Sequence, residues 1–127
     1  MRVIPLALAA LIAATPGIAG PQRDRVPAAT PSGNPVDCLQ LNRITNQVVR
    51  SDKVIDFFVG RQVFRNELPN ACPQLGFESR FMHRTSLNQL CSTDTITVLV
   101  GPNLTQGATC GLGRFQPVTL ARSAPAR

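Results

Sequence analysis

The chain has no tryptophan, no tyrosine and a single histidine among its 127 residues, and it has only six phenylalanines. So few aromatic rings make a base-stacking platform for nucleic acid improbable. The four cysteines stand 34, 19 and 19 residues apart, without the close Cys-x-x-Cys spacing of a zinc site. No Gly-x-Ser-x-Gly motif surrounds a serine. We therefore do not place nucleic-acid binding, zinc-dependent chemistry or serine hydrolysis among the leading function classes.

The first nineteen residues have the three parts of a secretory signal peptide. Arg2 supplies the positive charge, residues 3–14 form a short apolar stretch, and Gly17-Ile18-Ala19 places small residues before a cleavage position. No later apolar run reaches the length of about 18 residues that a transmembrane helix needs, and no cysteine stands directly after the cleavage position, where a lipoprotein anchor would be attached. We therefore expect residues 1–19 to be removed and the mature chain to be periplasmic or secreted, without a membrane segment.

Composition predicts one small domain between two tails. Residues 20–35 and 121–127 are rich in proline, alanine and charge without an apolar period, so we expect both to be disordered. Residues 36–120 remain as the folded part. A domain of about 85 residues buries only about 60–65% of its unfolded surface, so it gains much from cross-links.

The basic charge lies mostly outside that domain. The whole chain has a formal charge of +6, but residues 36–120 contain eight basic and six acidic residues. No specific binding of nucleic acid is expected from so small an excess. The basic residues are twelve arginines and one lysine, which with frequent alanine and proline is typical of a GC-rich bacterial genome.

The residue pattern predicts a mainly β fold. Residues 54–59 and 62–68 are two apolar runs around Gly60-Arg61, which is typical of a hairpin. Threonine alternates with isoleucine and valine over residues 95–100, so Ile96, Val98 and Val100 are expected to face the core. Further strands are expected at residues 77–85 and 110–120, and also at residues 39–49, where a short helix is the alternative. We expect an antiparallel meander or a small barrel of about six strands.

An even number of cysteines in an exported chain of this size indicates two disulfides. Three pairings are compatible with four cysteines. If the predicted strands form a meander, Cys38 and Cys91 lie at one end and Cys72 and Cys110 at the other. That parity favours the pairs Cys38–Cys91 and Cys72–Cys110.

Six different short motifs are distributed along the whole predicted domain. They are Asp37-Cys38-Leu39, Ile55-Asp56-Phe57, Asn66-Glu67-Leu68, Cys72-Pro73-Gln74-Leu75, Leu90-Cys91 with Asp94 three residues later, and Cys110-Gly111-Leu112-Gly113-Arg114-Phe115. In this order they resemble a family of small exported proteobacterial proteins to which no reaction is assigned. Members of that family often carry glycine after the Cys-Pro pair, where this chain has Gln74. The resemblance implies export and four paired cysteines, and it supplies no catalytic residue.

Four arginines are the best candidates for a binding surface. Arg61 and Arg65 are four residues apart on one predicted strand, and Arg80 and Arg84 are four apart on another, so each pair shares a face. If the two strands are neighbours, the patch is expected to bind an anionic polymer or lipid headgroups. The competing interpretation is that Asp56, Glu67 and Glu78 neutralise these arginines across the sheet.

The remaining polar candidates favour structural roles. His83 is a lone histidine on a predicted strand, where hydrogen bonding or exposure is commoner than catalysis or metal binding. Asp94 follows Cys91-Ser92-Thr93, which is ordinary turn chemistry. No catalytic residue, metal ligand or cofactor is assigned.

Three function classes follow from these observations. The first is a noncatalytic interaction domain of the cell envelope, whose partner would be an envelope protein or an anionic surface. The second is an anion-binding small-barrel module, and the third is a minimal envelope enzyme or an enzyme inhibitor.

Overall fold

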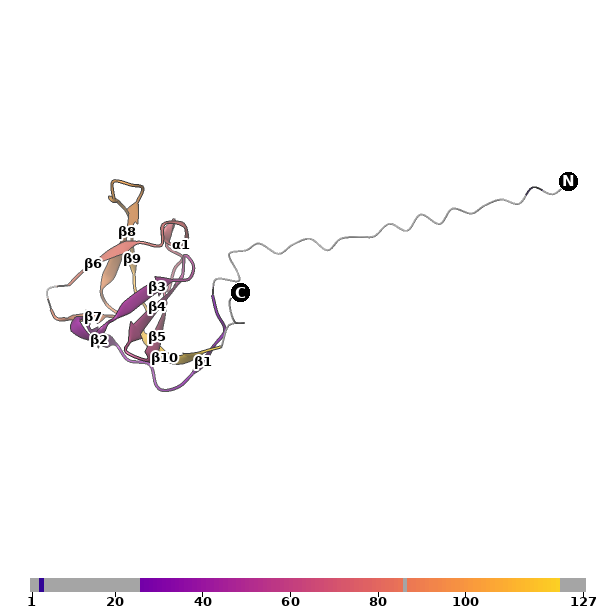
Figure 1. Cartoon of the computed structure of the whole chain (residues 1–127). Helices are drawn as coiled ribbons and strands as arrows, with labels where there is room; N and C mark the ends of the chain where they lie inside the picture. Colours follow the sequence, from indigo (N-terminus) through magenta and orange to yellow (C-terminus); the bar gives the residue numbers. More distant parts are fainter. Residues whose placement is uncertain (1–2, 4–25, 86, 122–127) are drawn as a thin grey trace.

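The computed structural model describes residue 3, residues 26–85 and residues 87–121, and these form ten strands and two helical turns (Figure 1). The strands are β1 (Ala29–Pro31), β2 (Cys38–Gln40), β3 (Asn46–Val49), β4 (Val54–Val59), β5 (Gln62–Glu67), β6 (Phe81–Arg84), β7 (Gln89–Cys91), β8 (Thr95–Val100), β9 (Thr105–Gly111) and β10 (Phe115–Leu120). A 3-10 turn spans Leu41–Arg43, and the α-helical turn α1 spans Leu75–Glu78. Across these described ranges no helix has the length and apolarity that a membrane span requires.

The strands form three antiparallel sheets. The largest has the order β1-β10-β5-β4-β3, the second pairs β2 with β7, and the third has the order β6-β8-β9. In Figure 1 the five-stranded sheet and the three-stranded sheet occupy different ends of the domain, with β2 and β7 beside them. The predicted fold class is confirmed: the domain is small, mainly β and antiparallel, and it contains two disulfides. The described strands do not close into a barrel.

Several predicted strands divide into shorter elements, which explains the larger number of strands. Residues 39–49 contain the 3-10 turn, because the chain leaves β7 there to join the edge of the large sheet. Residues 77–85 begin in α1, and residues 110–120 break between β9 and β10. The hairpin around Gly60-Arg61 is confirmed, with the register Val59 to Gln62. The prediction of six strands was therefore wrong mainly where one apolar run contains two elements that pair with different strands.

The segment expected to be disordered over residues 20–35 is ordered in its described part. β1 pairs with β10, the amide of Ser32 donates to the Pro117 carbonyl at 2.9 Å, and Gln116 Nε2 donates to the Gly33 carbonyl at 2.8 Å. The expectation was wrong because β10 would otherwise leave one edge of the large sheet unpaired, and β1 covers that edge. Residues 20–25, residues 122–127 and the predicted signal peptide apart from residue 3 lie outside the described part.

One hydrophobic core connects the three sheets. It includes Phe57 and Phe115 from the large sheet, Leu39 and Leu90 from the two-stranded sheet, and Ile96 and Val98 from the third. The rings of Phe57 and Phe115 meet edge to face with centroids 5.4 Å apart, and Phe81 of β6 approaches Phe57 in the same way at 6.4 Å. Ile96 and Val98 are fully buried and Val100 packs against the core, so the predicted inward face of β8 is confirmed.

Both predicted disulfides are present. Cys38 of β2 bonds to Cys91 of β7, and Cys72 in the loop after β5 bonds to Cys110 of β9. The pairs close segments of 53 and 38 residues, each worth about 4 kcal/mol in the chain-entropy model. Two disulfides are consistent with an oxidising compartment.

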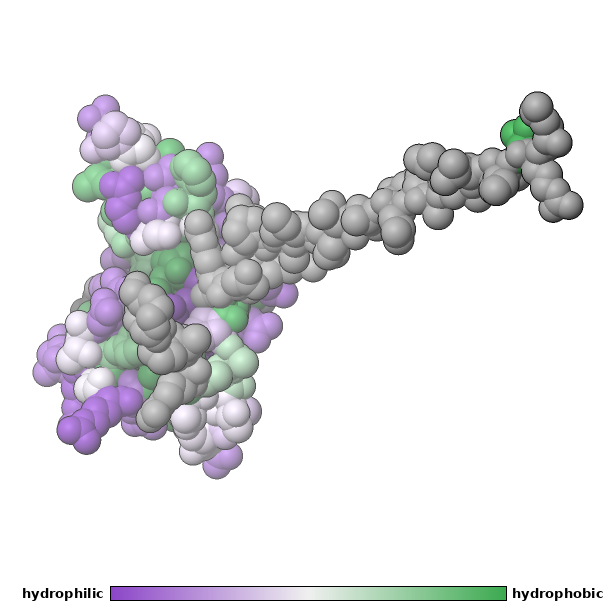
Figure 2. Space-filling model, turned by 45° about the vertical axis from the view of Figure 1, so that its right-hand side comes forward, coloured by the Kyte–Doolittle hydropathy of each residue, from purple (hydrophilic) through white to green (hydrophobic). Residues whose placement is uncertain are grey.

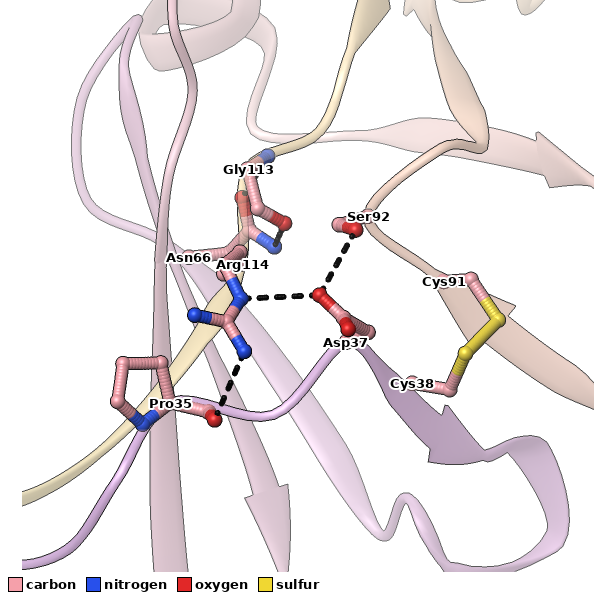
Figure 3. A network of polar contacts seen from close by, with 8 residues as sticks. All are labelled: Pro35, Asp37, Cys38, Asn66, Cys91, Ser92, Gly113 and Arg114. Atoms are coloured by element: carbon pink, nitrogen blue, oxygen red, sulfur yellow. Dashed lines mark hydrogen bonds and ion pairs between the residues drawn. A yellow bond between two sulfur atoms is a disulfide. The ribbon is translucent and has the colours of Figure 1, made fainter.

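A side-chain amide joins the large sheet to the connection between β9 and β10 (Figure 3). Asn66 is fully buried, its Nδ2 donates to the Gly113 carbonyl at 2.7 Å, and its Oδ1 accepts from the Gly113 amide at 2.8 Å. A Cβ atom at position 113 would collide with the Glu67 carbonyl oxygen. Glycine is therefore required at position 113 for this close approach.

Both ends of α1 have a left-handed backbone. Gln74, which precedes α1, has φ 70°, and Ser79, which follows it, has φ 58°. This conformation suits glycine and is unfavourable for residues with a Cβ atom.

We predict that Gln74→Gly stabilises the domain. Removing the exposed Gln74 side chain relieves the left-handed penalty, and the net gain in the free energy of unfolding should be about 0.5–1 kcal/mol. The matched control is Gln47→Gly on β3, where extended backbone makes the same substitution unfavourable by about 0.5–1 kcal/mol. Urea unfolding followed by circular dichroism measures both values. Equal destabilisation by the two variants would contradict the assigned conformation of residue 74.

Candidate functional site

The four predicted arginines do not form one patch across neighbouring strands. Arg61 lies in the turn before β5 and Arg65 lies on β5, in the large sheet, whereas Arg84 ends β6 in the three-stranded sheet. β5 pairs with β4 and β10, and β6 pairs with β8. The condition for a single patch, that the two strands are neighbours, is therefore not met. The cause is the Cys72–Cys110 disulfide and the buried Leu75, which bring the chain to the other side of the core between β5 and β6.

Ion pairing engages two of the four arginines. Arg65 Nε lies 2.8 Å from Asp56 Oδ1, and Arg80 Nη2 lies 3.0 Å from Glu78 Oε1. The side chains of Arg61 and Arg84 are exposed and form no hydrogen bond or ion pair with any described residue. The competing interpretation, neutralisation by acidic neighbours, thus holds for Arg65 and Arg80.

Among the described residues, the most buried charge lies on the face of the large sheet opposite to the core. Asp56 is the register partner of Arg65 on β5 and of Val48 on β3, and its exposed fraction is 0%. Arg65 donates to it twice, from Nε at 2.8 Å and from Nη2 at 3.0 Å. Arg50 donates through Nε at 2.9 Å to Oδ2. We call Arg50, Asp56 and Arg65 the arginine pair site.

Strand alternation explains why this site forms. Ile55 and Phe57 point into the core, so Asp56 between them must point to the opposite face. A buried carboxylate is tolerated only when charged partners and hydrogen bonds compensate its lost hydration. Arg65 was recognisable from the sequence as a candidate, but Arg50 was not, because it follows β3 and meets Asp56 only through the pairing of β3 with β4.

A second ionic network attaches the segment before β2 to the segment before β10 (Figure 3). Arg114 Nε donates to Asp37 Oδ1 at 2.9 Å, and Arg114 Nη2 donates to the Pro35 carbonyl at 3.2 Å. Asp37 also accepts a 3.4 Å hydrogen bond from Ser92 Oγ. The side chains of Arg114 and Asp37 are 58% and 66% exposed, so this network contributes little to stability.

The single histidine and the predicted turn aspartate have separate surroundings. His83 lies on β6 and, with Leu41, Arg84 and Thr85, lines an open surface depression. No described residue forms a hydrogen bond to its side chain. Asp94 closes the turn after β7, because its Oδ2 accepts from the Cys91 amide at 2.7 Å and its own amide donates to the Cys91 carbonyl at 2.9 Å. The turn interpretation of Asp94 is confirmed. Within the described ranges no three His, Cys, Asp or Glu side chains come together as metal ligands.

A phenylalanine that sequence reasoning assigned to a strand is the most exposed aromatic of the domain. All six phenylalanines are described, and Phe77 on α1 is 84% exposed, whereas the other five are buried or half-buried. The preceding Leu75 is fully buried. The sequence signal was weak, because Leu-Gly-Phe-Glu is compatible with a strand as well as with a single helical turn.

Hydrogen bonds hold α1 on both sides. Asp52 accepts from the Gly76 amide through Oδ1 and from the Cys72 amide through its carbonyl, both at 2.7 Å. Glu78 Oε1 accepts from Arg80 Nη2 at 3.0 Å and from the Gly101 amide at 3.2 Å. The exposed ring of Phe77 therefore projects from a turn that is bonded to two loops and, through Cys72, to β9.

Comparison of the chain with protein-family models, with curated proteins and with solved structures found no match. The interpretation of the arginine pair site and of the exposed Phe77 therefore rests on their geometry.

We predict that Asp56→Asn strongly destabilises the domain. The substitution leaves two guanidinium groups without their buried counter-charge, and it should lower the free energy of unfolding by about 3–5 kcal/mol. Asp37→Asn is the matched control, since it removes a carboxylate from an exposed ion pair and should cost less than about 1 kcal/mol. Both values come from chemical denaturation under oxidising conditions. A loss at position 56 as small as that at position 37 would contradict the structural role of the site.

Proposed function

We propose that this chain is an exported, noncatalytic interaction domain that binds a partner protein through Phe77. The observation that carries the proposal is the 84% exposure of this side chain on a turn that the buried Leu75 and hydrogen bonds from two neighbouring loops hold in place. Leaving a phenylalanine in water forgoes about 1.5–3 kcal/mol of burial free energy. A complex that covers the ring recovers that free energy.

The rigidity of α1 supports a binding role. A side chain that is held in place before binding loses less conformational entropy when a partner immobilises it. Aromatic side chains of this kind often act as the few residues that carry most of the binding free energy. The partner is therefore expected to present an apolar pocket that accepts one ring.

The surroundings of Phe77 favour a single anchoring residue over a broad apolar interface. The neighbours Pro73, Gln74 and Ser79 are exposed, and two of the three are polar. Figure 2 shows hydrophobic colour in separate areas between hydrophilic residues on the face that it draws. One apolar side chain that enters a pocket of the partner, surrounded by polar residues, is typical of a non-obligate interface.

The resemblance to the exported family supports a scaffold without chemistry. The residues that carry it have structural duties in this chain: Cys38, Cys72, Cys91 and Cys110 form the disulfides, Asn66 holds Gly113, and Asp94 closes a turn. His83 has no serine or cysteine as a hydrogen-bond partner among the described residues. Membership of that family, export and bacterial origin remain part of the proposal.

We propose photo-crosslinking as the test. The chain is expressed in its native cells with Phe77 replaced by the photoreactive residue benzoylphenylalanine, and illuminated. We expect one protein adduct of discrete mass, formed by chains whose N-terminus is Gly20. Gln106→benzoylphenylalanine, at an exposed position on β9, is the matched control and should give no such adduct.

Purified domain then tests the specificity of the adduct. Excess wild-type domain should abolish it, whereas Phe77→Ala should compete about 30-fold more weakly, as expected for a central interface residue. Phe77→Ala should change the free energy of unfolding by less than about 0.5 kcal/mol, because the ring is exposed. Equal competition by both proteins, an adduct between two copies of this chain, or no adduct at position 77 would each overturn the proposal.

A further inference from the structure

The arginine pair site has a net charge of +1, because two guanidinium groups share one carboxylate. The side chains of Arg50 and Arg65 are 20% and 13% exposed, so both charges are largely withdrawn from water while their orientation is held by Asp56. Interactions with such partly desolvated charges are less screened than those at an open surface. Dissolved salt therefore screens the excess positive charge of the site less than it screens a free surface arginine.

Several donors of the site remain unused. Arg50 donates only through Nε, and Arg65 donates only through Nε and Nη2. Among the described residues no buried side-chain nitrogen or oxygen lacks a hydrogen-bond partner, so both Nη atoms of Arg50 and Nη1 of Arg65 reach solvent. Guanidinium groups present such donors in a planar arrangement that suits phosphate and carboxylate oxygens.

Apolar side chains lie on one side of the site. Phe58 on β4 is two residues from Asp56 and therefore on the same face, and its register partner is Val63 on β5. Val63 pairs in turn with Val118 on β10. Val63 and Val118 are 8% and 7% exposed and do not belong to the main core cluster, and Phe58 is half-buried.

An acidic residue lies on the other side. Glu67 is two residues beyond Arg65 along β5, is exposed, and forms no ion pair with any described residue. An anion is repelled from that side and favoured toward Phe58. The charges and the apolar side chains thus favour the same direction of approach.

We propose that the arginine pair site binds an amphiphilic oxyanion, with the phosphate group on Arg50 and Arg65 and its hydrocarbon chain over Phe58. The phosphate can belong to a free alkyl phosphate or to a lipid headgroup, since both have the same chemistry. This site lies on the large sheet, so the proposal is independent of Phe77 and of its partner protein.

Titrations followed by NMR of backbone amides test the site. The probes are hexyl phosphate, inorganic phosphate and hexanol, each added to the oxidised domain. We expect saturable shifts at residues 50, 56 and 65, with hexyl phosphate binding more tightly than either of the other probes. Vesicles with and without phosphatidic acid form the last arm: binding only to the acidic vesicles assigns the lipid source, and binding of hexyl phosphate alone assigns the free one.

Arg50→Gln is the decisive variant, because Asp56 keeps both hydrogen bonds from Arg65. It should weaken hexyl phosphate binding about tenfold through the loss of a charged hydrogen bond. Arg84→Gln removes the same charge from an exposed position in another sheet and should weaken binding less than about twofold. Should Arg50→Gln not fold, Arg50→Lys retains the charge without the planar donors and should weaken binding about threefold.

Three outcomes would overturn the proposal. They are the absence of saturable shifts with hexyl phosphate, equal weakening by the Arg50 and Arg84 variants, and binding of hexanol as tight as that of hexyl phosphate.

Discussion

The Cys72–Cys110 disulfide is the constraint on which the arrangement of the sheets depends. It joins the loop after β5 to β9, and so holds the three-stranded sheet and α1 beside the core face of the large sheet. None of the three sheets has a second layer of its own, and each contributes apolar side chains to one shared core. A small domain with few aromatic residues gains a large share of its stability from such a cross-link. The exposure of Phe77 follows from the same attachment, because Cys72 and the buried Leu75 fix the turn that carries it.

The two faces of the large sheet are stabilised by different interactions. The core face buries Phe57 and Phe115 by simple apolar contact, whereas the opposite face contains a carboxylate with 0% exposure. Asp56 accepts hydrogen bonds from both Arg50 and Arg65, which leaves one positive charge in excess and donors directed to solvent. Structural compensation and ligand attraction are therefore properties of the same three side chains. Compensation of the buried carboxylate is sufficient to explain the ion pairs with Asp56. The proposed ligand would accept hydrogen bonds from the guanidinium donors that Asp56 leaves unused.

Much of the fold was accessible from the sequence. Alternation over residues 95–100 and the Gly60-Arg61 turn predicted β8 and the β4–β5 hairpin, because both signals are local. Strand parity predicted the cysteine pairs even though the intervening strands divide, since their ends stay on the expected sides. β1 was missed because Ala29–Pro31 has no apolar alternation and forms only by covering the edge of β10. Arg50 and Phe77 were missed because contact with Asp56 and exposure on α1 are tertiary properties.

The disulfide between the β5 loop and β9 determines both the packing of the sheets and the presentation of Phe77. The free energy of unfolding of a Cys72→Ala, Cys110→Ala double variant, compared with that of the oxidised wild type, tests this claim most directly. Closing the 38-residue segment is worth about 4 kcal/mol, so we expect the variant to lose about 2–5 kcal/mol and its amide spectrum to lose dispersion in α1 and β9 first. A variant within about 1 kcal/mol of the wild type, with an unchanged spectrum around Phe77, would contradict the account.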